Sequence, residues 1–107
     1  MRVVVASDDV AATTWVETVL RTGGFSVVVV PDATEQSPEL HGADVLIVDS
    51  KSAHSFADVR QIRRLLLAPR GKTLDMDGVR QGFADIIVVP SDEAEVVERG
   101  RHAAAHR

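Results

Sequence analysis

Five short runs of apolar residues divide the chain at similar intervals. They read VVVA, VVVV, VLIV, LLLA and IIVV and occupy residues 3–6, 27–30, 45–48, 65–68 and 86–89. None of them alternates between apolar and polar side chains, and uninterrupted apolar runs are typical of strands that are buried on both faces. Such strands belong in a parallel sheet that is covered by helices on both sides. The pattern therefore predicts five parallel strands.

A helix is predicted directly after the first run. The polar stretch Ser-Asp-Asp at residues 7–9 offers side chains that suit the N-cap of a helix. Apolar residues then recur at helical spacing from Ala12 to Leu20. The pair Gly23 and Gly24 follows, and glycine is the usual residue at the C-terminal end of a helix.

A second clear helix is predicted at the end of the chain. Asp92 and Glu95 have the spacing of a capping box, in which each side chain satisfies a free backbone N–H of the first turn. Val96 and Ala103 lie on one apolar face of this helix. Gly100 is expected to weaken its second half, because glycine has a low helix propensity.

The three other connections predict little or interrupted helix. Pro38 limits any helix in residues 31–44 to about two turns. A short helix is expected at residues 55–62, and there is room for another at residues 74–81. Strands and helices in alternation predict an α/β fold, with an open, doubly wound sheet of five parallel strands and shortened second and third helices. Ligands of such sheets bind beyond the carboxyl ends of the strands.

The composition narrows the domain organisation and the class of function. A length of 107 residues predicts one domain, residues 1–107. The chain has no cysteine, which excludes disulfides and thiolate metal sites. A net charge of −4 and the absence of tyrosine argue against direct binding of nucleic acid. The first residues do not resemble a signal peptide, and no apolar run approaches the roughly 20 residues of a membrane span. We therefore expect a cytoplasmic protein without membrane contact.

Candidate chemistry gathers where the strands end. Asp49 directly follows the run VLIV, and no helix of strong pattern begins there for it to cap. If the first and third strands are neighbours, Asp8, Asp9 and Asp49 converge in one crevice. Carboxylate oxygens of this kind suit Mg²⁺. The alternative for Asp8 and Asp9 is that one of them simply caps the first helix.

These features resemble the response-regulator receiver domain, the flavodoxin-like phosphoacceptor module of two-component signalling. The resemblance covers nearly the whole chain and is carried by VVVASDD, GGFSVVVV, ADVLIVD and GFADIIVVP. It implies the strand order 2-1-3-4-5, and it puts Asp49 at the phosphoacceptor position and Pro90 at the proline after the fifth strand. In the family an acidic pair holds Mg²⁺ and the aspartate takes phosphate from a histidine kinase. A hydroxyl side chain and a lysine then bind the phosphoryl group, and an aromatic residue follows the switch.

Several positions depart from the pattern of the family. Ser7 stands where the first acid of the pair is expected, although Asp9 offers a substitute. The positions of the hydroxyl, the aromatic and the lysine hold Ala68, Ile86 and Val89. Stabilisation of a phosphoryl group is mainly electrostatic and needs several of these groups together. We therefore expect Asp49 to be a remnant site that is not phosphorylated, and Mg²⁺ to bind weakly or not at all.

The function that we expect is that of a receiver-like regulatory module without catalysis of its own. It needs no cofactor and binds protein partners. The resemblance implies a partner surface made by the fourth helix, the fifth strand and the fifth helix, at residues 74–81, 86–89 and 92–101. It also implies that such a domain can be the N-terminal part of a longer protein with a fused output domain. The alternative is a working phosphoacceptor that uses Asp49, Mg²⁺ and an improvised charge from Lys51 or Arg70.

Three further residues or motifs have more than one interpretation. Lys51 is a candidate internal counter-ion for Asp8 and Asp49, or it points to water. APRGKT at residues 68–73 resembles the end of a phosphate-binding loop, but Leu66 stands where that motif needs a glycine, so we do not expect a nucleotide site. Trp15 falls in the apolar rhythm of the first helix, which predicts partly buried core rather than a partner contact.

Overall fold

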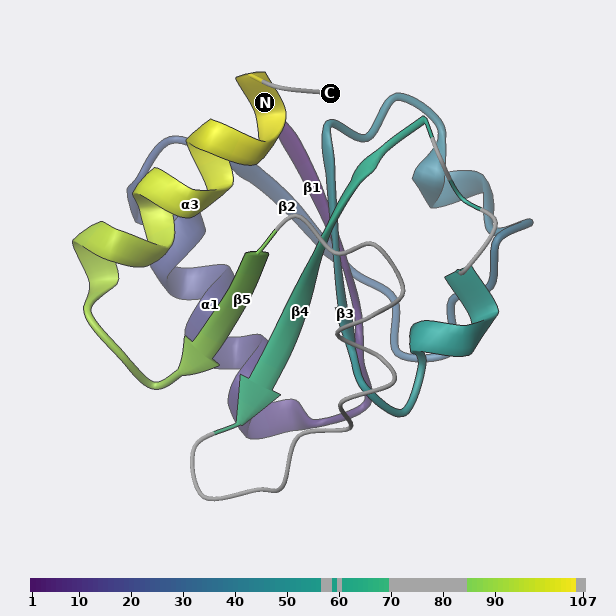
Figure 1. Cartoon of the computed structure of the whole chain (residues 1–107), viewed down its shortest axis with the longest axis horizontal. Helices are drawn as coiled ribbons and strands as arrows, with labels where there is room; N and C mark the ends of the chain where they lie inside the picture. Colours follow the sequence, from purple (N-terminus) through teal and green to yellow (C-terminus); the bar gives the residue numbers. More distant parts are fainter. Residues whose placement is uncertain (57–58, 60, 70–84, 106–107) are drawn as a thin grey trace.

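The five predicted strands form one parallel sheet in the computed structural model, which describes residues 1–56, 59, 61–69 and 85–105 (Figure 1). The strands are β1 (Arg2–Ala6), β2 (Ser26–Val29), β3 (Val45–Asp49), β4 (Arg63–Pro69) and β5 (Asp85–Val89). Their order in the sheet is β2-β1-β3-β4-β5. The predicted fold class and strand order are therefore confirmed.

The register of the sheet brings the strand ends together. Ala6 of β1 lies opposite Val48 of β3, and Asp49 of β3 lies opposite Leu67 of β4. Because all strands run in the same direction, their carboxyl ends meet at one edge of the sheet. This edge, which we call the carboxyl edge, holds the residues that follow β1 and the last residue of β3.

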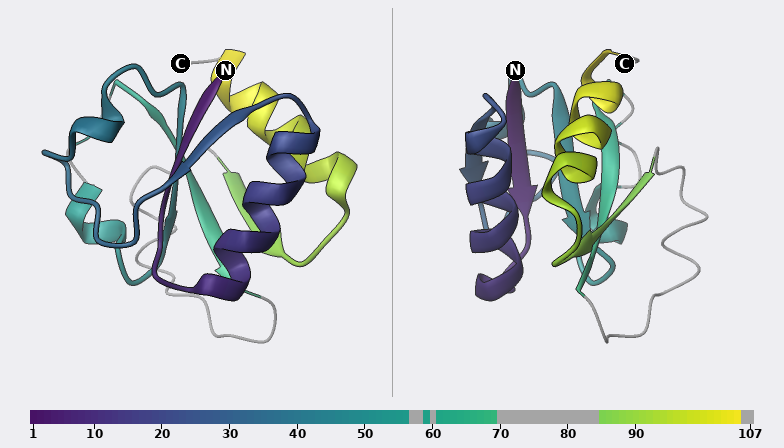
Figure 2. Two further views of the ribbon diagram at one scale, coloured as in Figure 1. Left: turned by 180° about the vertical axis from the view of Figure 1, so that it is seen from behind. Right: turned by 90° about the vertical axis from the view of Figure 1, so that its left-hand side faces the viewer.

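Two helices of 13 residues cover one face of the sheet, α1 (Val10–Thr22) and α3 (Glu93–Ala105). Figure 2 shows them side by side on this face. They bury an apolar cluster against the sheet, and its members from the strands are Val3, Val5, Val27, Val45, Ile47, Leu65, Leu67, Ile87 and Val89. α3 continues through Gly100 to Ala105, and a Cβ at Gly100 would lie 3.2 Å from the ring of Phe25.

In the described part of the chain, two short 3-10 helices lie on the other face, η1 (Pro38–Leu40) and η2 (Ala53–Phe56). The shortened second helix is thus confirmed. The helix expected at residues 55–62 is wrong in its extent, because η2 ends at Phe56 and Ile62 lies in a bend. Phe56 and Val59 are buried and three residues apart, a spacing that a 3-10 turn satisfies as well as an α-helix does. The helix predicted at residues 74–81 lies outside the described residues.

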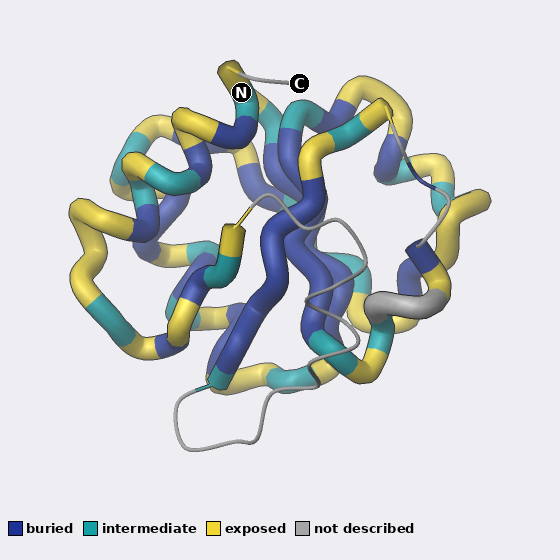
Figure 3. Tube along the Cα trace, in the orientation of Figure 1, coloured by how far each residue is buried: buried dark blue, intermediate teal, exposed yellow. Residues whose placement is uncertain are grey.

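Burial follows the prediction along the central strands β1, β3 and β4 but not along the edge strands β2 and β5, and in β2 only Val27 is buried. Figure 3 shows the central strands as continuously buried. In β5, Ile87 and Val89 are buried but Val88 is 36% exposed, so this edge strand alternates where its sequence does not. None of the helices in the described part of the chain has the length and hydrophobicity needed to cross a membrane.

Candidate functional site at the carboxyl edge

Asp49 is the last residue of β3 and is only 8% exposed. Its Oδ2 accepts a hydrogen bond of 2.6 Å from the hydroxyl of Ser7, and its Oδ1 accepts one of 2.8 Å from the backbone N–H of Ser52. Hydrogen bonds to an ionised carboxylate are shorter and stronger than those between neutral groups. Both oxygens of Asp49 are therefore held by groups of its own chain.

Ser7 links the end of β1 to Asp49. It follows directly after β1 and is buried. While its hydroxyl donates to Asp49, the same oxygen accepts a hydrogen bond of 3.2 Å from the backbone N–H of Asp9. The sequence identified Ser7 as a candidate cap of the first helix and as a missing acid, but not as a partner of Asp49. Its contact with Asp49 could have been suspected from a small hydroxyl residue and an acid at the ends of two neighbouring strands.

Asp9 is the N-cap of α1. Its Oδ1 accepts a hydrogen bond of 3.1 Å from the backbone N–H of Ala12, and its own backbone is extended, as is usual at this position. Of the two interpretations considered for the acids before the helix, capping is therefore the one that the structure shows for Asp9. Its carboxylate therefore stabilises the first turn of α1.

Asp8 forms an ion pair with Lys51. The distance from Lys51 Nζ to Asp8 Oδ2 is 2.9 Å, and the two side chains are 76% and 58% exposed. The hydrogen bond from Lys51 and then its positive charge lower the pKa of Asp8 below its ordinary value of 3.8. The same pair raises the pKa of Lys51, with a smaller contribution from the charge of Asp49. Lys51 thus contacts Asp8 directly and acts on Asp49 over a longer range.

The three acids do not form a metal centre as they stand. Within the described part of the chain, no group of three or more metal-ligating acids or histidines is close enough to hold an ion. Asp9 caps a helix, Asp8 binds an ammonium group, and Asp49 is held by Ser7 and Ser52. This donor set does not fit a divalent cation without rearrangement. Weak or absent binding of Mg²⁺ stays a prediction.

Comparison with known proteins identifies the fold. The chain matches no protein-family model and no curated protein. Among solved structures it resembles a response regulator from Chloroflexus aurantiacus J-10-fl, with a TM-score of 0.80 and 23% identity over 98% of both chains. It also resembles the signal receiver domain of the response regulator NarL from Mycobacterium tuberculosis, with a TM-score of 0.77 and 26% identity over 99% of this chain and 97% of that one. The chain has the receiver-domain fold of response regulators.

Receiver domains of this fold also occur within longer proteins. The chain is similar to the receiver domain of NtrX from Brucella abortus, with a TM-score of 0.81 and 13% identity over 98% of this chain and 99% of that domain. In a longer NtrX chain from the same organism the similarity covers 26% of the length. The likeness therefore extends to a receiver domain that is one part of a larger protein.

The carboxyl edge is apolar at two positions where the pattern of the receiver family has hydrogen-bond donors. Ala68 and Val89 are buried at the ends of β4 and β5, and neither side chain can donate a hydrogen bond or carry a charge. Ile86, at the position of the aromatic residue, is half-buried on β5. The Val89–Pro90 peptide bond is cis. These three residues thus lie in β4 and β5, while their correspondence to the functional positions of the family stays a prediction.

An apolar groove of about 350 Å³ borders the carboxyl edge between α1 and the ends of β4 and β5. The described residues that line it are Asp9, Ala11, Ala12, Trp15, Pro69, Val89 and Pro90. Trp15 is half-buried and packs against the apolar cluster beneath α1. The prediction that Trp15 is partly buried core is therefore confirmed.

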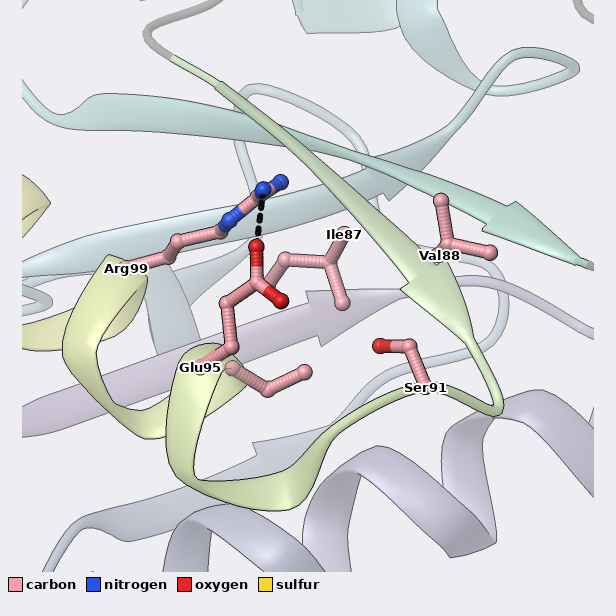
Figure 4. Close-up of a pocket in the computed structure, with 6 residues that line it drawn as sticks. Ile87, Val88, Ser91, Glu95 and Arg99 are labelled. Carbon is pink, nitrogen blue, oxygen red and sulfur yellow. Dashed lines mark hydrogen bonds and ion pairs between the residues drawn. The ribbon is translucent and has the colours of Figure 1, made fainter.

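A second hollow, of about 280 Å³, lies between β5 and α3 of the receiver fold (Figure 4). Ile87, Val88 and Ser91 line it from β5 and the turn that follows, and Glu95 and Arg99 line it from α3. Arg99 pairs with Glu95 at 2.5 Å and also donates to the backbone oxygen of Ile86. The hollow lies on the part of the predicted partner surface that the structure describes. The remaining part of that predicted surface, residues 74–81, lies outside the described residues.

Proposed function

We propose that this chain is a receiver-like regulatory module that acts through protein partners and is not phosphorylated at Asp49. The observation that carries the proposal is the state of the Asp49 carboxylate. One of its oxygens is held at 2.6 Å by the hydroxyl of Ser7 and the other at 2.8 Å by the N–H of Ser52. A phosphoacceptor has to present a carboxylate oxygen as a nucleophile to the incoming phosphorus, and each oxygen here already accepts one hydrogen bond.

The electrostatics around Asp49 support the same proposal. Transfer of a phosphoryl group depends on cations and hydrogen-bond donors that surround the charge of the transferred group. Ala68 and Val89 are apolar at the neighbouring strand ends, and Lys51 is paired with Asp8. A phosphoryl group on Asp49 would therefore meet few donors from the residues that the resemblance assigns to this task.

The test is incubation with acetyl phosphate and Mg²⁺, followed by intact mass measurement. We expect no phosphoryl adduct on the wild-type chain. The variant Ser7→Asp, Ala68→Thr, Val89→Lys returns the missing groups of the family's pattern, and an adduct on this variant shows that the assay can detect the reaction. An adduct that forms on the wild type and is lost in Asp49→Asn would contradict the proposal. The chain would then be a working phosphoacceptor that uses Asp49, Mg²⁺ and a charge from Lys51 or Arg70.

The surface that we propose for the partner is the face formed by β5 and α3. Val88 is 36% exposed on β5, and it lines the same hollow as Glu95 and Arg99 (Figure 4). Interface cores combine apolar side chains with arginine, and this face offers both. The partner is a cytoplasmic protein or an output domain on the same polypeptide, as the similarity to one part of NtrX suggests.

A further inference from the structure

The carboxyl edge contains a positive charge that belongs to the chain itself. Lys51 stands two residues after Asp49, in the loop that follows β3, and reaches across to Asp8 in the loop that follows β1. Its ammonium nitrogen lies 2.9 Å from Asp8 Oδ2. A cation thus bridges the same two loops whose acids were expected to share a metal ion.

An ammonium group and a divalent cation compete for such oxygens. Both need lone pairs of the carboxylates, and their like charges repel each other when they are close. Mg²⁺ also gives up its bound water reluctantly, so it does not readily replace a cation that is already tethered beside the carboxylate. The carboxylate of Asp9 is in use as well, since its Oδ1 accepts the capping hydrogen bond from Ala12. An ion that binds Asp8 Oδ2 therefore has to compete with Lys51 for that oxygen.

We propose that Lys51 is the built-in cation of this site and that it keeps divalent cations from Asp8 and Asp49. The inference deepens the proposed function and rests on it, because it names the group that stands in for the metal of a working receiver. The ammonium holds Asp8 directly, while Ser7 and Ser52 hold Asp49. The site is then stable without a metal ion.

The proposal is tested by titration with MgCl₂ at constant ionic strength, followed through the backbone amide NMR signals of residues 8, 9, 49 and 51. Lys51→Ala should bind Mg²⁺ measurably, with an affinity about two- to fivefold higher than that of the wild type, the range expected from the loss of an exposed ion pair. Lys51→Arg keeps the positive charge and should behave like the wild type. Arg101→Ala is the matched control, because it removes one charge from an exposed ion pair with Glu98 on α3.

Two results would overturn the proposal. The first is that Lys51→Ala binds Mg²⁺ no better than Arg101→Ala, or not at all, since the gain would then be absent or due to net charge alone. The second is that Lys51→Arg binds as tightly as Lys51→Ala, which would show that the positive charge is not the cause. Circular dichroism and a thermal melt of each variant check that it is folded.

Failure of this proposal and failure of the proposed function give different results. A phosphoryl adduct on wild-type Asp49 contradicts the proposed function, whatever Lys51→Ala does in the titration. A wild type that stays unphosphorylated, together with a Lys51→Ala variant that has not gained affinity for Mg²⁺, contradicts only the role of Lys51. The two experiments use separate readouts, mass and amide shifts.

Discussion

At the scale of single residues, the hydroxyl of Ser7 determines the surroundings of Asp49. A buried carboxylate is costly unless hydrogen bonds compensate for the water that it has lost. Ser7 and Ser52 provide these bonds, and both contacts lie within the chain. The sequence predicted Asp49 as the central acid but not its partners. The contact with Ser7 depends on the pairing of β1 with β3, which joins residues 42 positions apart.

Substitution of Asp49 tests this arrangement through stability. Asp49→Asn should change the free energy of unfolding by less than about 1 kcal/mol, because an amide can accept from Ser52 and donate to the hydroxyl of Ser7. Asp49→Ala should cost roughly 1–3 kcal/mol, because it leaves the buried Ser7 hydroxyl and the Ser52 N–H without this acceptor. Urea unfolding measures both values. Equal losses in the two variants would show that the hydrogen bonds do not matter.

The ion pair of Lys51 with Asp8 gives a prediction about acid titration. The pKa of Asp8 is lowered by Lys51, so Lys51→Ala should raise it towards its ordinary value of 3.8. NMR titration of the Asp8 carboxyl measures this shift, and Arg101→Ala should leave it unchanged. An unchanged pKa in Lys51→Ala would mean that the pair does not persist in solution.

The sign of the effect on stability follows from the direction of the shift. A carboxyl group with a lowered pKa in the folded state stabilises the fold above its unfolded pKa, and this contribution is lost as the pH falls through the folded-state pKa. Wild type and Lys51→Ala should therefore differ at neutral pH and converge in acid below the folded-state pKa of Asp8. The difference should be small and should shrink with added salt, since both side chains are exposed.

At the scale of elements, α1 and α3 pack closely because glycine lies between them. A Cβ on Gly23, at the end of α1, would lie 2.8 Å from both methyl groups of Val97 on α3. Gly23 has a φ of −80°, which any residue can adopt. Space rather than backbone conformation therefore favours glycine at this position.

Gly23→Ala should destabilise the fold by roughly 1–3 kcal/mol, because two packed elements have to move apart. The cost should largely disappear in a Val97→Ala background, where the obstructing methyl groups are gone. A double-mutant cycle of thermal or urea unfolding measures this coupling. Gly24→Ala is the control: Gly24 has a φ of +94° and open space around it, so its cost comes from the backbone and Val97→Ala should not relieve it.

The elements also show how far a pattern of apolar residues predicts structure. The strands and the two long helices follow from runs and spacings that have one interpretation. The elements that cover the second face could not be predicted in this way, because the spacing of Phe56 and Val59 fits both a 3-10 helix and an α-helix. The exposure of Val88 was not predicted either, since the run IIVV is the same whether its strand is central or at an edge.

At the scale of the whole molecule, the described elements cover the two faces of the sheet with different kinds of helix. Two helices of 13 residues pack on one face, whereas the described cover of the other consists of η1, η2 and the segments around them. The second apolar cluster joins β1 and β3 to these short elements through Leu40, Phe56 and Val59. The domain thus keeps the sheet order of the receiver fold, and the described elements on this face are short 3-10 helices.

The two links across the carboxyl edge close nearly the same loop of the chain. Ser7 with Asp49 and Asp8 with Lys51 are separated by 42 and 43 residues. The entropy of closing a loop of this length is already lost when β1 pairs with β3, so each link adds only its local free energy. Neither link is needed to bring the strands together. The chemistry of this edge can therefore change residue by residue during evolution while the sheet beneath it stays folded.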